Sequence, residues 1–274
     1  MDITKTIRLN NGVEMPRLGL GVWRAEEGGQ VENAVKWALE FGYRSIDTAK
    51  VYGNEAGVGK AIRESGVPRE ELFVTTKVWN DEQGYESTLK AFDNSLRDLQ
   101  LDYIDLYLIH WPVEGKYNDT WRAMEEIYAS GKVKAIGVSN FHAHHLDDLM
   151  SHAEIVPVIN QIELHPYLNQ KELRDYCKDK GIVVEAWSPL GQGKVLENEV
   201  LRQIAAKYNK TVAQIILRWD LQHDIVTIPK SVTKSRIIEN GSVFDFQLTD
   251  EDMAKIDGLN KNERFGANPD TFDF

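Results

Sequence analysis

Residues 103–110 read YIDLYLIH, an almost unbroken apolar run that ends in a histidine. Strands of a parallel sheet have this composition, because helices cover both faces of the sheet and leave neither face to water. Similar short runs recur along the chain. We therefore expect strands at Arg44–Asp47, Leu72–Val78, Tyr103–His110, Val133–Ser139, Val158–Glu163, Val183–Trp187, Ile225–Pro229 and, with a less regular pattern, near Val243–Phe246.

Amphipathic helical patterns separate these strands. In residues 30–41, for example, apolar side chains recur at the three- and four-residue spacing of one helix face. The expected helices are Gln30–Phe41, Thr88–Leu99, Thr120–Ala129, Gln170–Lys180, Glu199–Tyr208 and Val212–Gln222, followed by a late helix that Thr249 caps. Alternating strands and helices predict parallel strands joined by right-handed crossovers. About eight such units favour a closed (β/α)8 barrel, the TIM barrel, over an open doubly wound sheet.

The beginning of the chain has a different pattern. Asn10-Asn11-Gly12 lies between the apolar segments Ile7–Leu9 and Val13–Met15, which predicts an N-terminal β-hairpin with a positive φ at Gly12. The chain has 274 residues, close to the roughly 250 of one barrel, and no linker or low-complexity segment interrupts it. We expect a single barrel domain over residues 1–274.

Composition excludes several classes of partner. The net charge of −11 argues against a nucleic-acid binder, which needs a basic face. Cys177 is the only cysteine, so no intramolecular disulfide can form, and we expect a reducing, cytoplasmic compartment. No apolar segment approaches the roughly 20 residues that span a membrane, and no signal peptide is apparent. An acidic surface without a repeated apolar stripe makes a monomer the default expectation.

Polar residues gather at the ends of the expected strands, where the active sites of such barrels lie. They are Asp47, Lys77, His110, Ser139, Asn140, Gln161, Glu163, Trp187, Ser188, Lys230 and Ser231. Burying polar groups without partners is costly. Their recurrence at successive strand ends therefore predicts one shared pocket.

Four residues near this pocket, Tyr52, Lys77, Asp47 and His110, together form a group that can donate a proton. Alone, each has a structural alternative, since Asp47 could cap a helix and His110 could be a satisfied core histidine. A free tyrosine has a pKa of about 10, and a nearby ammonium, here Lys77, lowers the pKa of Tyr52 by favouring the phenolate. Asp47 would hold that ammonium in place. His110 would donate a hydrogen bond to a substrate carbonyl or share its proton.

Seven segments carry a family resemblance. They are GYRSIDTAKVYGNE (42–55), LFVTTKVW (72–79), DLYLIHWP (105–112), GVSNF (137–141), NQIELHP (160–166), WSPLGQG (187–193) and IPKSVTKSRIIENGSVFDF (228–246). In their order and intervals the chain resembles the aldo-keto reductases from residue 7 to the end, above all prokaryotic-type glyoxal and 2,5-diketo-gluconate reductases. The resemblance implies NADPH-dependent reduction of aldehydes and ketones, with Tyr52 as general acid, Lys77 and Asp47 tuning it, and His110 orienting the carbonyl.

The resemblance also implies an NADPH site in which the nicotinamide lies against Trp187. The implied contacts are Gly21, Val22, Trp23, Asp47, Ser139, Asn140, Gln161, Trp187, Ser188, Leu190, Gln192, Lys230, Ser231, Val232, Thr233, Arg236, Glu239 and Asn240. Independently of the resemblance, Lys230, Lys234 and Arg236 place three cations within seven residues of an acidic chain. Arginine binds phosphate through two parallel hydrogen bonds. This cluster predicts NADPH rather than NADH.

The implied substrate pocket is aromatic. Its residues are Trp23, Val51, Trp79, His110 and Trp111. Apolar contacts discriminate weakly between substrates, so we expect small reactive aldehydes such as methylglyoxal and glyoxal, or keto-sugar acids. By resemblance, longer loops cover the site in animal members of the family. Val113–Asn118 and the segment after Arg264 are short, so we expect a more open mouth than theirs. Lys50 is expected to add a cation at the rim and to favour anionic carbonyl substrates.

Other readings remain open at this point. A nicotinamide-binding sensor or interaction protein with little turnover is the main alternative, as in the channel-associated β subunits, and a metal-dependent barrel hydrolase is another. We expect no metal site, because His142, His144 and His145 open an exposed helix without a carboxylate or cysteine set at metal spacing. Gly19-Leu20-Gly21 lacks the third glycine of a dinucleotide fingerprint, and Gly59-Lys60 does not complete a P-loop.

Overall fold

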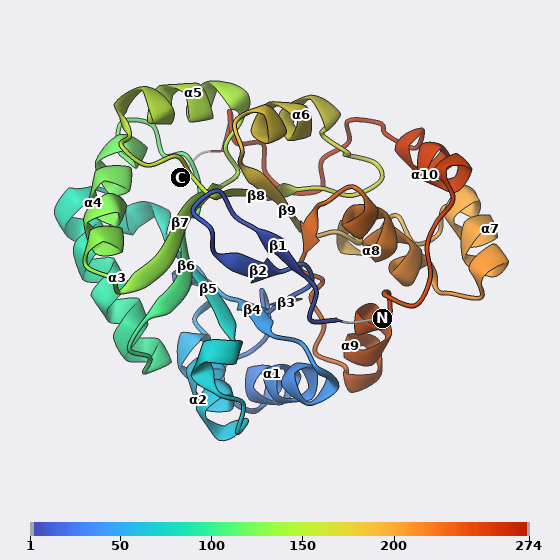
Figure 1. Cartoon of the computed structure of the whole chain (residues 1–274), viewed down its shortest axis with the longest axis horizontal. Coiled ribbons are helices and arrows are strands. Elements are labelled where there is room, and N and C mark those ends of the chain that lie inside the picture. The colour runs from blue at the N-terminus through green and yellow to red at the C-terminus, as the bar shows by residue number, and fades with distance from the viewer. Residues whose placement is uncertain (1–2, 273–274) are drawn as a thin grey trace.

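The computed structural model describes residues 3–272, and these form a parallel sheet rolled into a barrel (Figure 1). The strand order is β10-β9-β8-β7-β6-β5-β4-β3. The strands are β3 (Leu20–Gly21), β4 (Ser45–Asp47), β5 (Phe73–Val78), β6 (Ile104–Ile109), β7 (Val133–Ser139), β8 (Ile159–Glu163), β9 (Val183–Trp187) and β10 (Val226–Thr227). Parallel bridges from Leu18 to Thr227 and from Gly21 to Lys230 join the two edges. The predicted (β/α)8 barrel is confirmed.

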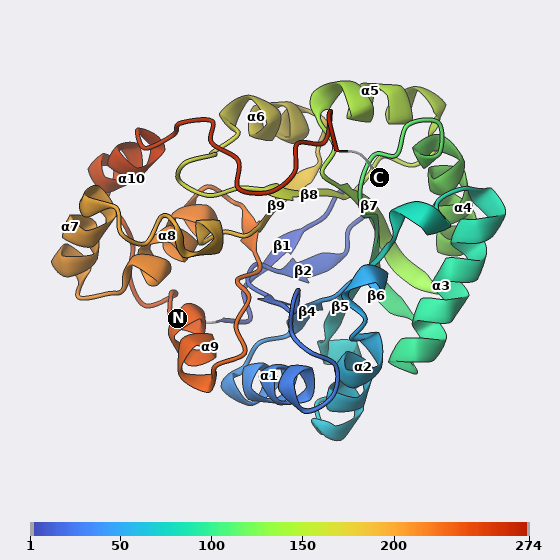
Figure 2. The same cartoon turned by 180° about the vertical axis from the view of Figure 1, so that it is seen from behind.

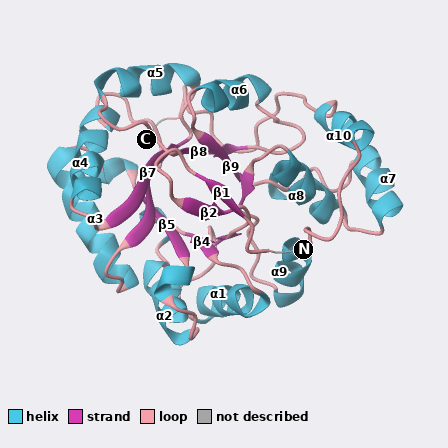
Figure 3. Cartoon of the chain, viewed as in Figure 1, coloured by secondary structure: helices cyan, strands magenta, loops and turns pink. Residues whose placement is uncertain are grey.

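Helices surround the sheet on its outer face, as the secondary-structure colouring in Figure 3 shows. They are α1 (Gly29–Phe41), α2 (Glu55–Glu64), α3 (Tyr85–Leu99), α4 (Tyr117–Ala129), α5 (Ala143–His152), α6 (Lys171–Asp179), α7 (Glu199–Tyr208), α8 (Val212–Gln222), α9 (Lys234–Gly241) and α10 (Asp250–Asp257). The side chain of Thr249 accepts a hydrogen bond from the Asp252 amide, so the predicted cap of α10 is confirmed. No helix within residues 3–272 combines the length and apolar composition needed to cross a membrane.

An N-terminal hairpin closes one end of the barrel (Figure 1). Strands β1 (Thr6–Arg8) and β2 (Glu14–Pro16) pair antiparallel, and Gly12 in the turn has a φ of 88°. From this hairpin, Leu9 and Met15 pack against inward-facing residues of the barrel strands. Because the hairpin blocks this end, ligands must enter at the opposite end, where the strands end. Figure 2 shows the C-terminal segment crossing that opposite end.

Two strands differ from the expectations. Val243–Phe246 is not a strand, because Val243 and Phe244 are buried by packing in the outer layer and pair with no strand in the described sheet. The first barrel strand is instead Leu20–Gly21, which is too short to give a pattern. A Cβ at position 21 would lie 2.8 Å from the Ile228 carbonyl oxygen, so glycine there allows the close strand approach that joins the sheet edges.

Helix α2 was also absent from the expected elements. Its sequence, EAGVGKAIRE, contains two glycines, which lower helix propensity. A Cβ at Gly59 would lie 1.9 Å from the carbonyl oxygen of Leu99. The glycine therefore permits α2 to pack backbone against backbone at the end of α3, a tertiary reason that local sequence does not reveal.

Candidate active site

Three of the four expected catalytic residues stand at the ends of neighbouring strands. Asp47 ends β4, Lys77 lies near the end of β5, and His110 directly follows β6. Tyr52 ends the short 3-10 turn Lys50–Tyr52 that follows β4. The parallel register of β4, β5 and β6 brings these ends to one edge. The structure thus brings together all four residues.

Lys77 is the centre of this group. Its ammonium donates to Asp47 Oδ1 at 2.7 Å and to the Thr48 carbonyl oxygen at 2.9 Å, and lies 3.4 Å from the Tyr52 hydroxyl. The side chains of Lys77 and Asp47 are 0% and 3% exposed. The His110 ring meets the rings of Tyr52 and Trp79 edge-on, with centroids 5.8 and 5.1 Å apart. A buried cation therefore lies beside a partly buried phenol, and the histidine ring forms the adjoining wall.

Burial dominates the protonation of these groups. It raises the pKa of Tyr52, and the opposing effect of the Lys77 ammonium is smaller. The expected lowering effect of the ammonium is present, but the net shift is upward because removing the phenolate from water costs more than the ammonium returns. Burial lowers the pKa of Lys77, but Asp47 and Tyr52 outweigh it and raise the pKa overall. Burial, followed by Lys77, holds the pKa of His110 well below its usual range. At neutral pH the group is thus a neutral tyrosine and a neutral histidine beside an ammonium.

A second layer of polar side chains supports the carboxylate of Asp47. Gln161 Nε2 donates to Asp47 Oδ2 at 2.8 Å and to Glu185 Oε2 at 2.7 Å. Burial, with the charge of Asp47 second, raises the pKa of Glu185 to about 8. Glu185 was not among the expected residues. Its signal in the sequence is a carboxylate in the middle of the apolar strand VVEAW, which needs a partner inside the barrel.

Ser139, Asn140 and Trp187 form a hydrogen-bonded chain along the next strand ends. The Trp187 indole donates to Asn140 Oδ1 at 2.8 Å. Asn140 Nδ2 donates to the His110 carbonyl oxygen at 2.9 Å, and Ser139 Oγ donates to the Gln161 carbonyl oxygen at 2.8 Å. Asn140 has a φ of 65°, which asparagine tolerates better than most residues. These bonds fix the orientation of the Trp187 ring at the edge of the pocket.

A cavity of about 450 Å³ opens over these groups. Among the expected residues it is lined by Gly21, Trp23, Asp47, Val51, Tyr52, Trp79, His110, Trp111, Ser139, Asn140, Gln161, Trp187, Ser188, Gln192 and Lys230. It is also lined by Arg24, Ile228, Phe265, Gly266, Ala267 and Phe272, which were not expected. All five expected substrate contacts therefore face one cavity with Asp47 and Tyr52, while Lys77 is not among its lining residues.

The C-terminal segment 264–272 contributes Phe265, Gly266, Ala267 and Phe272 to the wall of this cavity. Glu163 anchors the segment by accepting hydrogen bonds from the amides of Phe265 and Gly266 at 2.6 and 3.1 Å. Further along, the Phe272 ring packs against Trp111 with centroids 4.6 Å apart. The segment is short, but its buried anchor directs it across the strand ends. Sequence offered no signal for this, because the anchor lies a hundred residues away.

A second cavity of about 620 Å³ adjoins the first and shares Trp23, Arg24, Ser188, Gln192 and Lys230 with it. Its other expected residues are Leu190, Ser231, Val232, Thr233, Arg236, Glu239 and Asn240. Burial, followed by repulsion from Arg24, lowers the pKa of Lys230. Lys234 instead pairs with Glu40 at 3.6 Å and lines neither cavity.

Val22 and Lys50 were expected near the cofactor or the pocket rim, but neither lines a cavity. Val22 packs in the core at 1% exposure, and its amide donates to the Asp47 carbonyl oxygen, so its side chain lines neither cavity. The expected placement of Lys50 at the rim is also wrong. Its ammonium pairs with Asp98 at 2.7 Å and lies 4.0 Å from Glu55, and it is not among the residues lining the cavities. Asp98 on α3 holds the ammonium of Lys50 in this ion pair.

Comparison with known proteins agrees with this geometry. The aldo/keto reductase family model matches residues 17–261. The glyoxal reductase of Bacillus subtilis is 64% identical over 97% of this chain and 96% of its own length. The methylglyoxal reductase DkgA of Escherichia coli is 50% identical, covering 97% of each chain. A Bombyx mori aldo-keto reductase solved with NADP superimposes with a TM-score of 0.90, at 42% identity, over 97% of this chain and 95% of that one. The chain belongs to the aldo/keto reductase family.

Proposed function

We propose that this protein reduces small reactive aldehydes and ketones to alcohols with NADPH, and that Tyr52 supplies the proton. The observation that carries the proposal is the buried contact of the Tyr52 hydroxyl with Lys77, which in turn is held by Asp47. A sensor that only binds a nucleotide has no need of a buried ammonium beside a phenol. Burying such a pair is costly unless the geometry is good, so catalysis is the better account of it.

The residues of the first cavity divide the work of carbonyl reduction. When bound, the reduced nicotinamide supplies a hydride to the carbonyl carbon. Tyr52 donates its proton to the carbonyl oxygen, and Lys77 stabilises the phenolate that remains. The raised pKa of Tyr52, caused by burial, keeps the proton on the hydroxyl until the oxygen of the substrate becomes basic. His110, neutral because burial lowers its pKa, can orient the carbonyl without adding charge.

The second cavity suits a phosphorylated dinucleotide. Arg24, Lys230 and Arg236 line it, and within the described part of the chain none of them forms an ion pair with a carboxylate. In a chain of net charge −11, three such cations in one cavity indicate a site for an anion. Helix α9 begins beside them at Lys234, and Thr233 makes no side-chain cap bond there. The N-terminal amide groups of α9 also face this cavity, and such groups attract a phosphate. We therefore assign Lys230 and Arg236 to the adenosine 2′-phosphate.

The nicotinamide end would lie in the first cavity. Ser139, Asn140 and Gln161 line the first cavity next to Trp187, whose indole ring is held by Asn140. A flat aromatic ring beside amide and hydroxyl groups fits a nicotinamide carboxamide. A Cβ on Gly266 would lie 2.4 Å from Trp187, so the C-terminal segment closely covers part of the indole ring. The part of the indole ring that this segment does not cover is left for the cofactor.

The walls of the first cavity favour small, poorly discriminated carbonyl compounds. Trp79 and Trp111 line it together with Phe272, and Trp23 is 40% exposed at its edge. Apolar walls separate related substrates by only about 1–3 kcal/mol per methylene. The relatives named glyoxal reductase and methylglyoxal reductase support glyoxal and methylglyoxal as substrates. With Lys50 paired to Asp98, that residue gives no reason to favour keto-sugar acids.

The test is cofactor oxidation with a panel of carbonyl compounds. Loss of the absorbance of reduced nicotinamide is followed with methylglyoxal, glyoxal, an aromatic aldehyde and a keto-sugar acid, and NADH is run in parallel. The proposal predicts turnover of the two small aldehydes that is faster with NADPH than with NADH. Bound NADPH without turnover of any of the four would contradict it and favour a sensor.

A further inference from the structure

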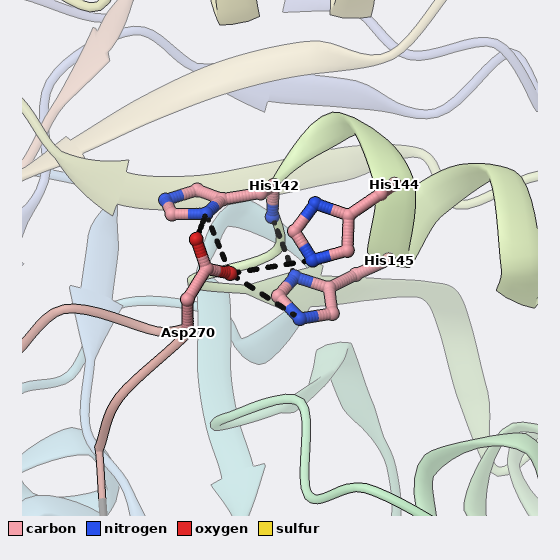
Figure 4. A group of neighbouring side chains, drawn as sticks. All are labelled: His142, His144, His145 and Asp270. Carbon is pink, nitrogen blue, oxygen red and sulfur yellow. Dashed lines mark hydrogen bonds and ion pairs between the residues drawn. The ribbon is translucent and has the colours of Figure 1, made fainter.

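Three imidazoles and a carboxylate meet outside the active site. His142, His144 and His145 lie at the start of helix α5 (Ala143–His152), and Asp270 belongs to the C-terminal segment. Figure 4 shows all three rings directed toward the carboxylate. Potential ligand atoms of the four residues lie within 4.8 Å of one another. The sequence predicted no metal here because the carboxylate lies 125 residues beyond His145, and only the fold adds it to the set.

The distances to Asp270 match those of a coordination sphere. The nearest nitrogens of His142, His144 and His145 lie 3.0, 3.3 and 3.7 Å from its oxygens. Zinc bonds to histidine nitrogen and carboxylate oxygen are about 2.0–2.2 Å, so neighbouring tetrahedral ligands stand roughly 3.3 Å apart. The set therefore needs small ring movements rather than backbone rearrangement to close around an ion. His144 is 65% exposed, which leaves its ring free to turn.

Hydrogen bonds determine which ring nitrogens are ready to bind a metal. Arg264 lies 3.0 Å from His142 Nε2 and can only donate, which places the ring proton on Nδ1 toward Asp270. His145 Nδ1 accepts the His142 backbone amide at 3.0 Å, so its Nε2 likewise carries a proton. A histidine binds a metal as the neutral ring, through the nitrogen without a proton, so these two rings must move their protons to the other nitrogen and release these two hydrogen bonds. His144 and Asp270 form the core of the set, and His142 and His145 join it after this shift.

We propose that His142, His144, His145 and Asp270 bind a divalent transition-metal ion, with zinc as the best fit, and that the ion fastens the C-terminal segment to helix α5. Imidazole ligands select zinc, nickel or copper over magnesium and calcium, which prefer all-oxygen sites. The site is separate from the proposed chemistry, and none of its four residues lines either cavity.

Fastening Asp270 has a consequence for the active site. Phe272, two residues further on, packs against Trp111 and lines the first cavity. The segment is already held at its other end, where Phe265 and Gly266 donate to Glu163. A metal at Asp270 adds a second fixed point next to Phe272. It is thereby expected to hold this wall of the substrate pocket in place.

Calorimetric titration of the full chain, without a histidine tag, tests the site with zinc chloride as the probe and magnesium chloride as the comparison. His144→Ala and Asp270→Asn remove one ligand each. His152→Ala is the matched control, because His152 lies on the same helix with a similar exposure of 64% and is not in the cluster. Cys177 is the only thiol and is buried, so it does not compete for zinc.

The proposal predicts one zinc ion per chain, at least tenfold weaker binding in His144→Ala and Asp270→Asn, unchanged binding in His152→Ala and no uptake of magnesium. It also predicts that zinc slows amide hydrogen exchange in residues 264–272 of the unaltered chain and not of Asp270→Asn. Absence of zinc binding, or equal binding by all variants, would overturn the site. Zinc binding without slower exchange in this segment would overturn its role in fastening the wall.

Discussion

The ammonium of Lys77 lies 2.7 Å from the carboxylate of Asp47, and both side chains are almost fully buried. A cation in such a place is stable only because its partner is present. The same ammonium lies 3.4 Å from the Tyr52 hydroxyl. The ion pair therefore serves two purposes: it satisfies two buried charges, and it places a positive charge where the phenolate forms in the mechanism that we propose.

Replacing Lys77 by methionine should affect both properties. Loss of one partner leaves Asp47 charged and buried, which costs about 3–5 kcal/mol of unfolding free energy. Without the ammonium, proton transfer from Tyr52 loses its support, and we expect kcat to fall by roughly 10²–10⁴-fold. Urea unfolding and steady-state kinetics at one pH measure the two effects. A folded Lys77→Met variant with unchanged kcat would show that the ammonium is only structural.

Glu185 should make stability depend on pH. Burial, followed by Asp47, raises its pKa from the ordinary 4.5 to about 8, so the folded protein keeps a proton that the unfolded chain loses. This contribution is complete below the unfolded pKa and is lost as pH rises through about 8. The slope is at most about 1.4 kcal/mol per pH unit. Urea unfolding from pH 5 to 8 should show a smaller decline in Glu185→Gln, and equal declines would contradict this.

Arg236 should determine the preference for NADPH. A hydrogen bond to a charged group contributes roughly 1.5–3 kcal/mol, so Arg236→Ala should raise the KM for NADPH by about tenfold or more. The KM for NADH, which lacks the 2′-phosphate, should change little. Lys234→Ala is the matched control, since Lys234 lies on the same helix but pairs with Glu40. An equal effect of Arg236→Ala on both cofactors would refute the assignment.

Lys50 should not select anionic substrates. Its ammonium is engaged by Asp98 at 2.7 Å, which also raises the pKa of Lys50. Lys50→Ala is therefore expected to change the KM values for a keto-sugar acid and for methylglyoxal by the same factor. A selective loss for the acid, measured under identical salt conditions, would mean that Lys50 turns toward the pocket during catalysis.

Long, regular elements were predictable from the sequence, and so were the residues at their ends. The strands Val133–Ser139 and Val183–Trp187 and the helices Glu199–Tyr208 and Val212–Gln222 have the expected bounds. Each is specified by its own apolar pattern. The polar residue that ends such a run is then placed by strand register alone, which is why Asp47, Lys77 and His110 could be expected to meet.

Features that depend on distant contacts were not predictable. Leu20–Gly21 is a strand because the barrel closes there, and its two residues carry no period of their own. The wall formed by Phe265 and Phe272 depends on Glu163, which lies far along the chain. The net rise in the pKa of Tyr52 was likewise not predictable, because the sequence reveals a nearby lysine but not the degree of burial. In each case the tertiary environment outweighs the local signal.

Tyr52→Phe tests the central claim most directly, because it removes one hydroxyl and keeps the ring that packs against His110. Methylglyoxal reduction and NADPH binding are measured on the same preparation of the variant. Our account predicts a loss of kcat of about 10²-fold or more, with the Kd for NADPH unchanged. Turnover close to that of the unaltered protein would contradict Tyr52 as the proton donor, and with it the proposed mechanism.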